Sequence, residues 1–176
     1  MIKINLTLTM DDIEVIDISD KLPKQGTYPT RELSEIFKID IHHSATLTSN
    51  YKGIETIKNF AEWHINNNGW PGIGYNYIIP PNDKIVYKVG KDNQVRWSVG
   101  NNNKNALSTL LVGNFSEESI SDIQYQTALV WIGHKRSAYS VDYNKIKGHN
   151  EFPGHQSNSC PGIDMNKFRS NINYHF

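Results

Sequence analysis

The sequence predicts a single α/β domain of the mixed α+β kind, with a central mixed β-sheet flanked by helices. Its 176 residues, 38% of them hydrophobic, suit one domain that buries a real core. Apolar segments of period two alternate along the chain with segments of helical period. No internal repeat or low-complexity linker separates these segments. Strands and helices that interleave in this way pack as layers around one sheet.

Short apolar segments bounded by Gly, Pro and Asn indicate the strands. They cover residues 2–8, 14–18, 37–41, 75–79, 85–89, 94–99, 107–115 and 145–148. In the third of these, Phe37, Ile39 and Ile41 alternate with polar residues, and the strand runs straight into His42 and His43. A strand end is a place where side chains converge on a pocket, so these histidines are candidates for a site.

Three segments have the spacing of helices: residues 53–68, 123–140 and 164–172. In the first, Ile54, Ile57, Ala61 and Ile65 recur on one helical face, and the following NNNG breaks the helix. The interleaved order of strands and helices predicts helices on the faces of the sheet.

The charge balance excludes some classes of function. Eighteen basic residues cancel eighteen acidic ones, and no long run of one sign occurs. Phosphate neutralisation needs a basic patch, so we expect no nucleic-acid binding. No segment is apolar and long enough for membrane insertion, and the N-terminus lacks the apolar block of a signal peptide. We therefore expect synthesis in the cytoplasm, and a single cysteine excludes an intrachain disulfide.

The segment GHNEFPGHQSNSCPG, residues 148–162, contains two histidines and the only cysteine in a Gly/Pro-bounded loop. Imidazole and thiolate are the ligands that zinc prefers, and a catalytic zinc has three protein ligands and one open position. His42, His149 and Cys160 would supply that number, with His155 as the rival ligand. Their spacing matches no short zinc-finger pattern, so the residues alone leave open whether they bind zinc or are structural.

A family resemblance bears on this question. The ordered segments IDIHHSA, AEWHINNNGWPGIGYNYII, LLVGNF and GHNEF…SCPG resemble the zinc-dependent N-acetylmuramoyl-L-alanine amidases. This type-2 amidase group includes phage endolysins, bacterial autolysins and the peptidoglycan recognition proteins. The similarity runs in the right order over roughly residues 35–170. It implies a catalytic domain at 35–176, with residues 1–34 as an N-terminal extension packed on it, and a zinc site in an open groove.

The resemblance implies a role for each matching residue. His42, the first histidine of HHSA, matches the first zinc ligand, His149 the second and Cys160 the third. Tyr75, in GIGYNY, matches the catalytic tyrosine whose hydroxyl lies beside the metal and the substrate carbonyl.

Other residues in the motifs are expected to have different roles. His43 and His64 are interpreted as structural hydrogen-bonding residues, and nothing in the resemblance puts His155 on the metal. Trp70 and Trp97 suit either the lining of a substrate groove or the core.

The sequence departs from the family pattern at two positions. Many relatives have a lysine or threonine two residues before the third ligand, where this chain has Asn158. Some relatives carry a glutamate on the strand that corresponds to LSTLLVG, where this chain has Leu110. Asn158 is then a neutral catalytic donor beside Tyr75, or else Ser157 or Ser159 takes that place.

The function implied is peptidoglycan hydrolysis, at the amide between N-acetylmuramic acid and the L-alanine of the stem peptide, with Zn²⁺ as cofactor. The alternative is a peptidoglycan-binding module of the same fold that does not cut. A structural zinc domain, with His155 as fourth ligand, is the third possibility. We expect a monomer that acts on the cell wall, after phage or prophage release or export by a non-classical route.

Overall fold

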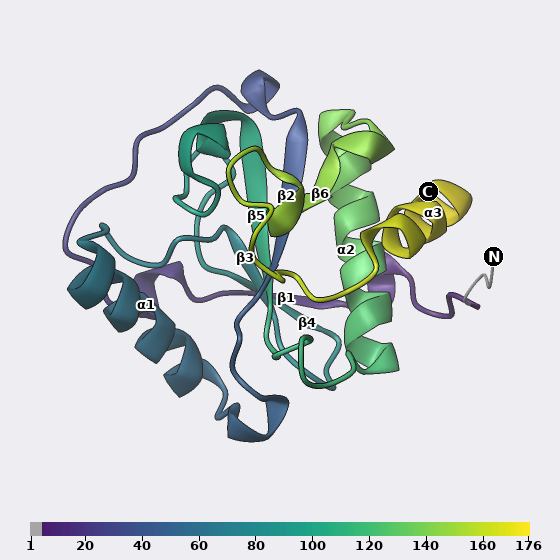
Figure 1. The fold of residues 1–176 in the computed structure, drawn as a ribbon, viewed down its shortest axis with the longest axis horizontal. Coiled ribbons are helices and arrows are strands. Elements are labelled where there is room, and N and C mark those ends of the chain that lie inside the picture. Colours follow the sequence, from purple (N-terminus) through teal and green to yellow (C-terminus); the bar gives the residue numbers. More distant parts are fainter. Residues whose placement is uncertain (1–4) are drawn as a thin grey trace.

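The computed structural model describes residues 5–176, and its centre is a six-stranded sheet with the order β1-β4-β3-β5-β2-β6 (Figure 1). The strands are β1 (Glu14–Asp17), β2 (Lys38–His43), β3 (Tyr77–Ile79), β4 (Ile85–Lys88), β5 (Ala106–Leu111) and β6 (Ile146–Gly148). β3 and β4 form an antiparallel hairpin, and every other neighbouring pair is parallel. The prediction of a mixed central sheet is confirmed.

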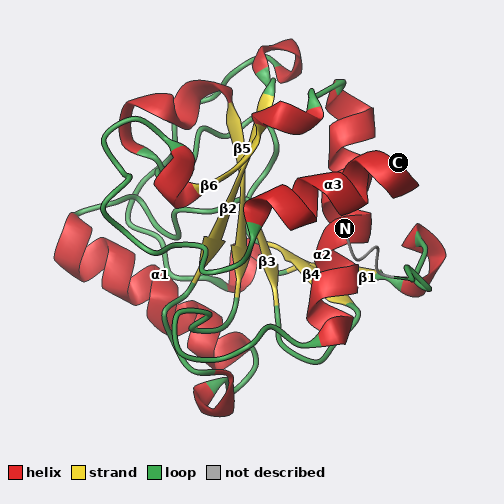
Figure 2. Ribbon diagram, turned by 45° about the vertical axis from the view of Figure 1, so that its right-hand side comes forward, coloured by secondary structure: helices red, strands yellow, loops and turns green. Residues whose placement is uncertain are grey.

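Helices cover both faces of this sheet, as Figures 1 and 2 show. α1 (Ile54–Asn68) lies on one face, whereas α2 (Asp122–Tyr139) and α3 (Met165–His175) lie on the other. The alternation of side chains along each strand divides the core in two. Ile39 and Ile41 of β2 pack in the cluster with α2 and α3, while Leu110 of β5 packs in the cluster with α1. No helix in residues 5–176 is long and apolar enough to cross a membrane.

Local signals in the sequence determine the ends of these helices. α1 ends at Gly69, whose left-handed φ of 67° lets its N–H bond back to the last turn. Ser121 caps the start of α2 by accepting the Gln124 N–H, and Asp164 caps α3 by accepting the Lys167 N–H. The three predicted helices are therefore confirmed, with boundaries within a few residues.

The predicted strand at residues 2–8 lies partly outside the described residues, and the described part, residues 5–8, is not a strand. The alternation is nevertheless real, because Leu8 is buried and Thr7 is exposed. The Thr7 N–H bonds to the Gln126 side chain of α2. The segment therefore packs on a helix, where period two arises without a strand partner. The next predicted strand does form, as the edge strand β1 beside β4.

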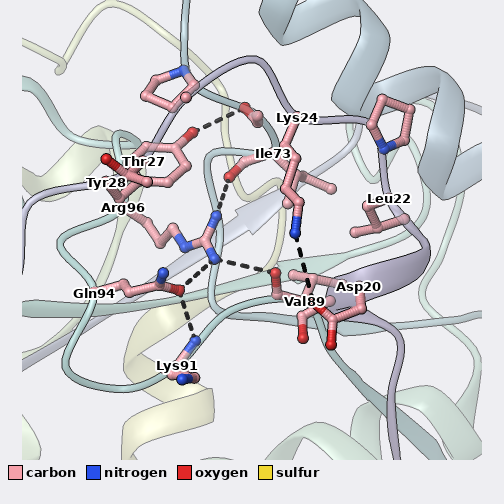
Figure 3. A pocket seen from close by; sticks show the side chains of 15 residues that line it. Asp20, Leu22, Lys24, Thr27, Tyr28, Ile73, Val89, Lys91, Gln94 and Arg96 are labelled. Carbon is pink, nitrogen blue, oxygen red and sulfur yellow. Dashed lines mark hydrogen bonds and ion pairs between the residues drawn. The ribbon is translucent and has the colours of Figure 1, made fainter.

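The strand predicted at residues 94–99 was wrong, and Arg96 explains why. Arg96 is 7% exposed, and its guanidinium carbon lies 4.4 Å from the centre of the Tyr28 ring. It donates to the carbonyl oxygens of Ile73 and Val89 and to the Gln94 side chain (Figure 3). Backbone hydrogen bonds from the Arg31 N–H to Asn93 and from the Val95 N–H to Pro29 hold the segment beside residues 27–31, and the one β-bridge of residues 94–99 joins Gln94 to Thr30. A cavity of about 450 Å³ remains there, and none of the candidate metal ligands lines it.

Candidate metal centre

The connectivity of the sheet brings two of the predicted ligands together. β2 and β6 are parallel neighbours with Ile41 opposite Gly148. The next residues along the chain are His42, within β2, and His149, directly after β6. Their ring centroids are 4.6 Å apart. Both imidazoles therefore lie at the carboxyl ends of adjacent strands, the edge where parallel sheets commonly carry their sites.

The loop after β6 returns the thiol of Cys160 to the same place. The Asn150 N–H donates to the carbonyl oxygen of Cys160 at 2.9 Å, which closes the loop on itself. Gly148 permits this approach, because a Cβ there would come within 2.6 Å of the Pro161 ring. The sulfur lies 3.7 Å from His42 Nδ1 and accepts the backbone N–H of His43 at 3.3 Å.

These three residues have the chemistry and spacing of a zinc site. One ligand atom from each of His42, His149 and Cys160 lies within 4.8 Å of the others. A tetrahedral zinc with Zn–N near 2.0 Å and Zn–S near 2.3 Å separates its N and S ligands by about 3.6 Å. The 3.7 Å between His42 and Cys160 fits that separation. Two imidazoles and a thiolate therefore suit zinc, and three ligands leave a fourth position open.

His42 is held by a carboxylate beneath it. Its Nε2 lies 2.7 Å from Asp40 Oδ2, which leaves Nδ1 to face Cys160. Burial disfavours the charged imidazole, but Asp40 and Cys160 outweigh it and raise the pKa of His42 to about 9 in the absence of a cation. Burial likewise opposes ionisation of Asp40, yet the bonds from His42, Ser108 and Ser98 hold its pKa below the usual value. The pair is thus ionised around the ligand position.

His149 has a different partner. Its Nε2 lies 2.9 Å from His155 Nδ1, so Nδ1 is its remaining nitrogen. Burial lowers the pKa of His149 to about 4, and the charges on His42 and His155 add to this effect. His149 therefore offers a neutral imidazole at physiological pH. Among the described residues, His155 is outside the cluster that could hold a metal ion, and it contacts the site through His149.

Tyr75 borders the cluster from the loop before β3. Its ring centroid is 5.2 Å from that of His42, and burial raises the pKa of its phenol, with the charges of Cys160 and Asp40 adding to the shift. The hydroxyl is therefore a proton donor at neutral pH. A groove of about 500 Å³ runs from Tyr75 to α1, which contributes Phe60 and Trp63. The Trp63 side chain is 56% exposed.

His43 and His64 make the structural hydrogen bonds that their motifs suggested. His43 Nδ1 accepts the Phe115 N–H at 3.1 Å, and His64 Nδ1 accepts the Gly74 N–H at 3.2 Å. Burial and then the charge on His42 lower the pKa of His64 to about 4, so that it remains a neutral acceptor. The bond to Gly74 fixes the loop that carries Tyr75.

The side chain of Asn158 is engaged within its own loop. Its Oδ1 accepts the Cys160 N–H at 3.0 Å, and its Nδ2 donates to the His155 carbonyl oxygen at 2.6 Å. One donor hydrogen of the amide is left over. The Ser159 hydroxyl forms a hydrogen bond of 2.8 Å with the Ser116 hydroxyl. Leu110, on β5, lies opposite His42.

Sequence reasoning missed two residues of this site, Asp40 and Trp63. Asp40 had a readable signal, because residues two apart on a strand share a face and Asp40 precedes His42 by two. Trp63 also had a signal, because it lies off the helical face of Ile57, Ala61 and Ile65, but helical spacing does not show that a groove lies beside it. Trp70 and Trp97 are half-buried with ring centroids 6.3 Å apart, and neither lines the groove.

The fold and site define a single-domain α/β protein with a cluster of two imidazoles and one thiol at the edge of its sheet. A family model for N-acetylmuramoyl-L-alanine amidase matches residues 33–163, and the chain belongs to that family. The match spans the strands and the loop that carry all three clustered residues.

Individual relatives are distant. Peptidoglycan-recognition protein SC2 of Drosophila simulans is 25% identical over 166 residues, which cover 92% of this chain and 88% of that protein. An endolysin of Thermus scotoductus bacteriophage Ph2119 has 22% identity and a TM-score of 0.69 over 90% of this chain and 99% of its own. The N-acetylmuramoyl-L-alanine amidase LysC of Clostridium intestinale has 20% identity and a TM-score of 0.72 over 91% and 97%. The two solved structures support the fold.

The neutral state of His64 predicts a pH dependence of stability. Its pKa is about 4 in the folded protein and near 6.5 in the unfolded chain, so the unfolded chain binds the proton first as pH falls. The stability that neutral His64 contributes is therefore fully present above about pH 6.5 and is lost as the pH falls toward 4. Between pH 7 and pH 5, His64 should cost the wild type about 2 kcal/mol of unfolding free energy.

Urea unfolding at both pH values measures this loss. His64→Gln keeps a hydrogen-bond acceptor but has no titrating group. Between pH 7 and pH 5, its unfolding free energy should therefore fall less than that of the wild type, and the difference should equal the His64 contribution. The matched control is His134→Gln, at an exposed position on α2, which should behave like the wild type. An equal loss in all three proteins would show that His64 is not held neutral by the fold.

Proposed function

We propose that the protein is a zinc-dependent N-acetylmuramoyl-L-alanine amidase that hydrolyses the amide between N-acetylmuramic acid and L-alanine in peptidoglycan. Membership of the amidase family supports the reaction class. The observation that carries the proposal is the cluster of His42, His149 and Cys160, whose ligand atoms lie within 4.8 Å. Three ligands with an open fourth position are the arrangement of a catalytic zinc.

Binding without cleavage is the second candidate, because a relative is named a peptidoglycan-recognition protein. Recognition proteins of this superfamily typically lack the cysteine ligand. Cys160 is present here, and its sulfur lies near His42 and accepts a backbone N–H, as a thiolate ligand would. This observation favours the enzyme. A structural zinc would need a fourth protein ligand, and His155 is bonded to His149 instead.

The chemistry follows from the groups around the cluster. Zinc, when bound, would lower the pKa of a coordinated water toward ~7 and polarise the substrate carbonyl. The Tyr75 hydroxyl keeps its proton at neutral pH, because burial raises its pKa. It can therefore donate a hydrogen bond to the carbonyl oxygen as negative charge develops there. His42 and His149 would hold the metal, and the His64 bond to Gly74 keeps Tyr75 in place.

The groove beside Tyr75 suits a muramyl peptide. It has a volume of about 500 Å³ and combines polar residues after β2 with the aromatic side chains of Phe60 and Trp63. Indole faces stack on sugar rings, and hydroxyl groups hydrogen-bond amides. We also propose that the protein acts on the cell wall as a monomer. Loss of turbidity of a cell-wall suspension, with release of new amino groups, tests cleavage directly.

The ligand assignment predicts which variants lose the metal. His42→Ala, His149→Ala and Cys160→Ala should each lose bound zinc and activity, because two ligands hold zinc poorly. His155→Ala should keep one zinc per chain with weaker affinity, since His155 only orients His149. A chelator should abolish wild-type activity and zinc should restore it.

Metal analysis and the turbidity assay together check this assignment. His134→Ala, on the exposed side of α2, is the control and should match the wild type in both. Loss of zinc in His155→Ala with retention in His149→Ala would mean that the ligands in this loop are wrongly assigned. A zinc-loaded wild type that binds cell walls and releases no amino groups would identify a binding module.

The role of Tyr75 predicts a loss in kcat. Tyr75→Phe removes one donor and keeps the ring, so zinc content and fold should survive. Losing one oxyanion donor costs roughly 10²–10³ in kcat, and KM should change far less because the bond strengthens in the transition state. Asn158→Ala should cost at most about tenfold, since most of its hydrogen bonds lie within the loop. The reverse order of effects would transfer the catalytic role to Asn158.

Trp63 should act in binding alone. We expect Trp63→Ala to raise KM for peptidoglycan by about tenfold with little change in kcat, because stacking is equal in the ground and transition states. Tyr143→Ala is the matched control, since Tyr143 is an exposed aromatic residue, 46% exposed, and does not line the groove. A fall in kcat with unchanged KM for Trp63→Ala would contradict a binding role.

A further inference from the structure

Asp40 is a buried carboxylate whose hydrogen bonds converge on one oxygen atom. The residue is fully buried on β2. Its Oδ2 lies 2.7 Å from His42 Nε2, 2.7 Å from Ser108 Oγ and 2.8 Å from Ser98 Oγ. Its other oxygen, Oδ1, has no hydrogen-bond partner. The arrangement aims one charged oxygen at His42.

A buried charge needs compensation. Among the described residues, His42 is the one ion-pair partner of Asp40. No lysine or arginine forms an ion pair with it in that part of the chain. An isolated buried carboxylate is costly unless a cation is near. The buried Arg31 interacts with Asp40 only from beyond ion-pair distance. A cation bound in the cluster of His42, His149 and Cys160, on the far side of the His42 ring, would compensate the carboxylate through that ring.

Charge counting connects Asp40 to that cluster. A zinc ion with one thiolate and two neutral imidazoles has a net charge of +1. The carboxylate of Asp40 would reduce this to zero, which suits a buried position. With Asp40 accepting at Nε2, the proton of neutral His42 stays on Nε2 and the lone pair of Nδ1 faces Cys160.

We propose that Asp40 is the positioning residue of the metal centre, which fixes the tautomer of His42 and neutralises the loaded site. The inference rests on the proposed function, because it requires the cluster to bind zinc. Ser98 and Ser108 support Asp40 from two other segments. Ser108 comes from β5, and Ser98 comes from the segment between β4 and β5, outside the sheet. Their hydroxyls hold the carboxylate where it meets His42.

The test compares zinc affinity in matched variants of the full chain. Asp40→Asn keeps the size and one acceptor and removes the charge. Ser98→Ala and Ser108→Ala, combined, loosen the carboxylate and keep its charge. Asp92→Asn is the control, because Asp92 is another largely buried carboxylate but accepts hydrogen bonds from Tyr77, Tyr139 and Lys135. Competition with a zinc chelator gives the dissociation constant, and proton NMR of the zinc form reports the His42 Nε2–H.

Asp40→Asn should bind one zinc about 10–100-fold more weakly, and its Nε2–H signal should move upfield from the wild-type position. The double serine variant should shift both readouts in the same direction by less, whereas Asp92→Asn should shift neither. Activity is not needed for either readout, so the result is independent of the substrate.

Two failures are distinguishable. If the wild type binds no zinc, the proposed function fails and this inference with it. If the wild type binds zinc and Asp40→Asn binds it equally tightly with an unchanged Nε2–H signal, only the role of Asp40 is overturned. If Asp40→Asn does not fold, the double serine variant decides, and wild-type values for both of its readouts overturn the inference.

Discussion

The parallel pairing of β2 with β6 is the constraint on which the candidate site depends. It sets Ile41 opposite Gly148, and the next residue on each strand is a histidine. A shift of one residue in this register would turn one imidazole to the opposite face. Ile39 and Ile146 prevent such a shift, because both are fully buried in the core with α2 and α3. The hydrophobic core therefore determines the spacing of the two imidazoles.

The alternation along β2 lets one strand build both the core and the site. Ile39 and Ile41 face α2 and α3, so Asp40 and His42 must face the other side. Two buried polar residues on a central strand would be costly if they were unpaired. Asp40 and His42 satisfy each other, with further hydrogen bonds from Ser98 and Ser108. The face that looks unfavourable for folding is thus the one that carries His42, the proposed ligand.

Periodicity predicted most of the fold because it reports burial. It failed at residues 94–99 because alternation cannot reveal that Arg96 binds the carbonyl oxygens of Ile73 and Val89. It failed at residues 5–8 because packing on α2 produces the same pattern as a strand. For the site, motifs indicated the clustered residues, and the structure brings them together. Hydrogen bonds between distant segments, such as Ser108 to Asp40, leave no sequence pattern.

The departure from the family pattern at Leu110 is consistent with this arrangement of charge. Leu110 lies opposite His42 on β5 and lines the groove with Tyr75. If zinc binds as proposed, Cys160 and Asp40 would already balance the charge of the metal. A glutamate at position 110 would add a negative charge in a buried place, at a cost of several kcal/mol. The buried Leu110 adds no charge there, and a low local dielectric strengthens any hydrogen bond that Tyr75 donates. One buried carboxylate, Asp40, therefore suits the charge of the proposed zinc site, and a second carboxylate at position 110 would exceed it.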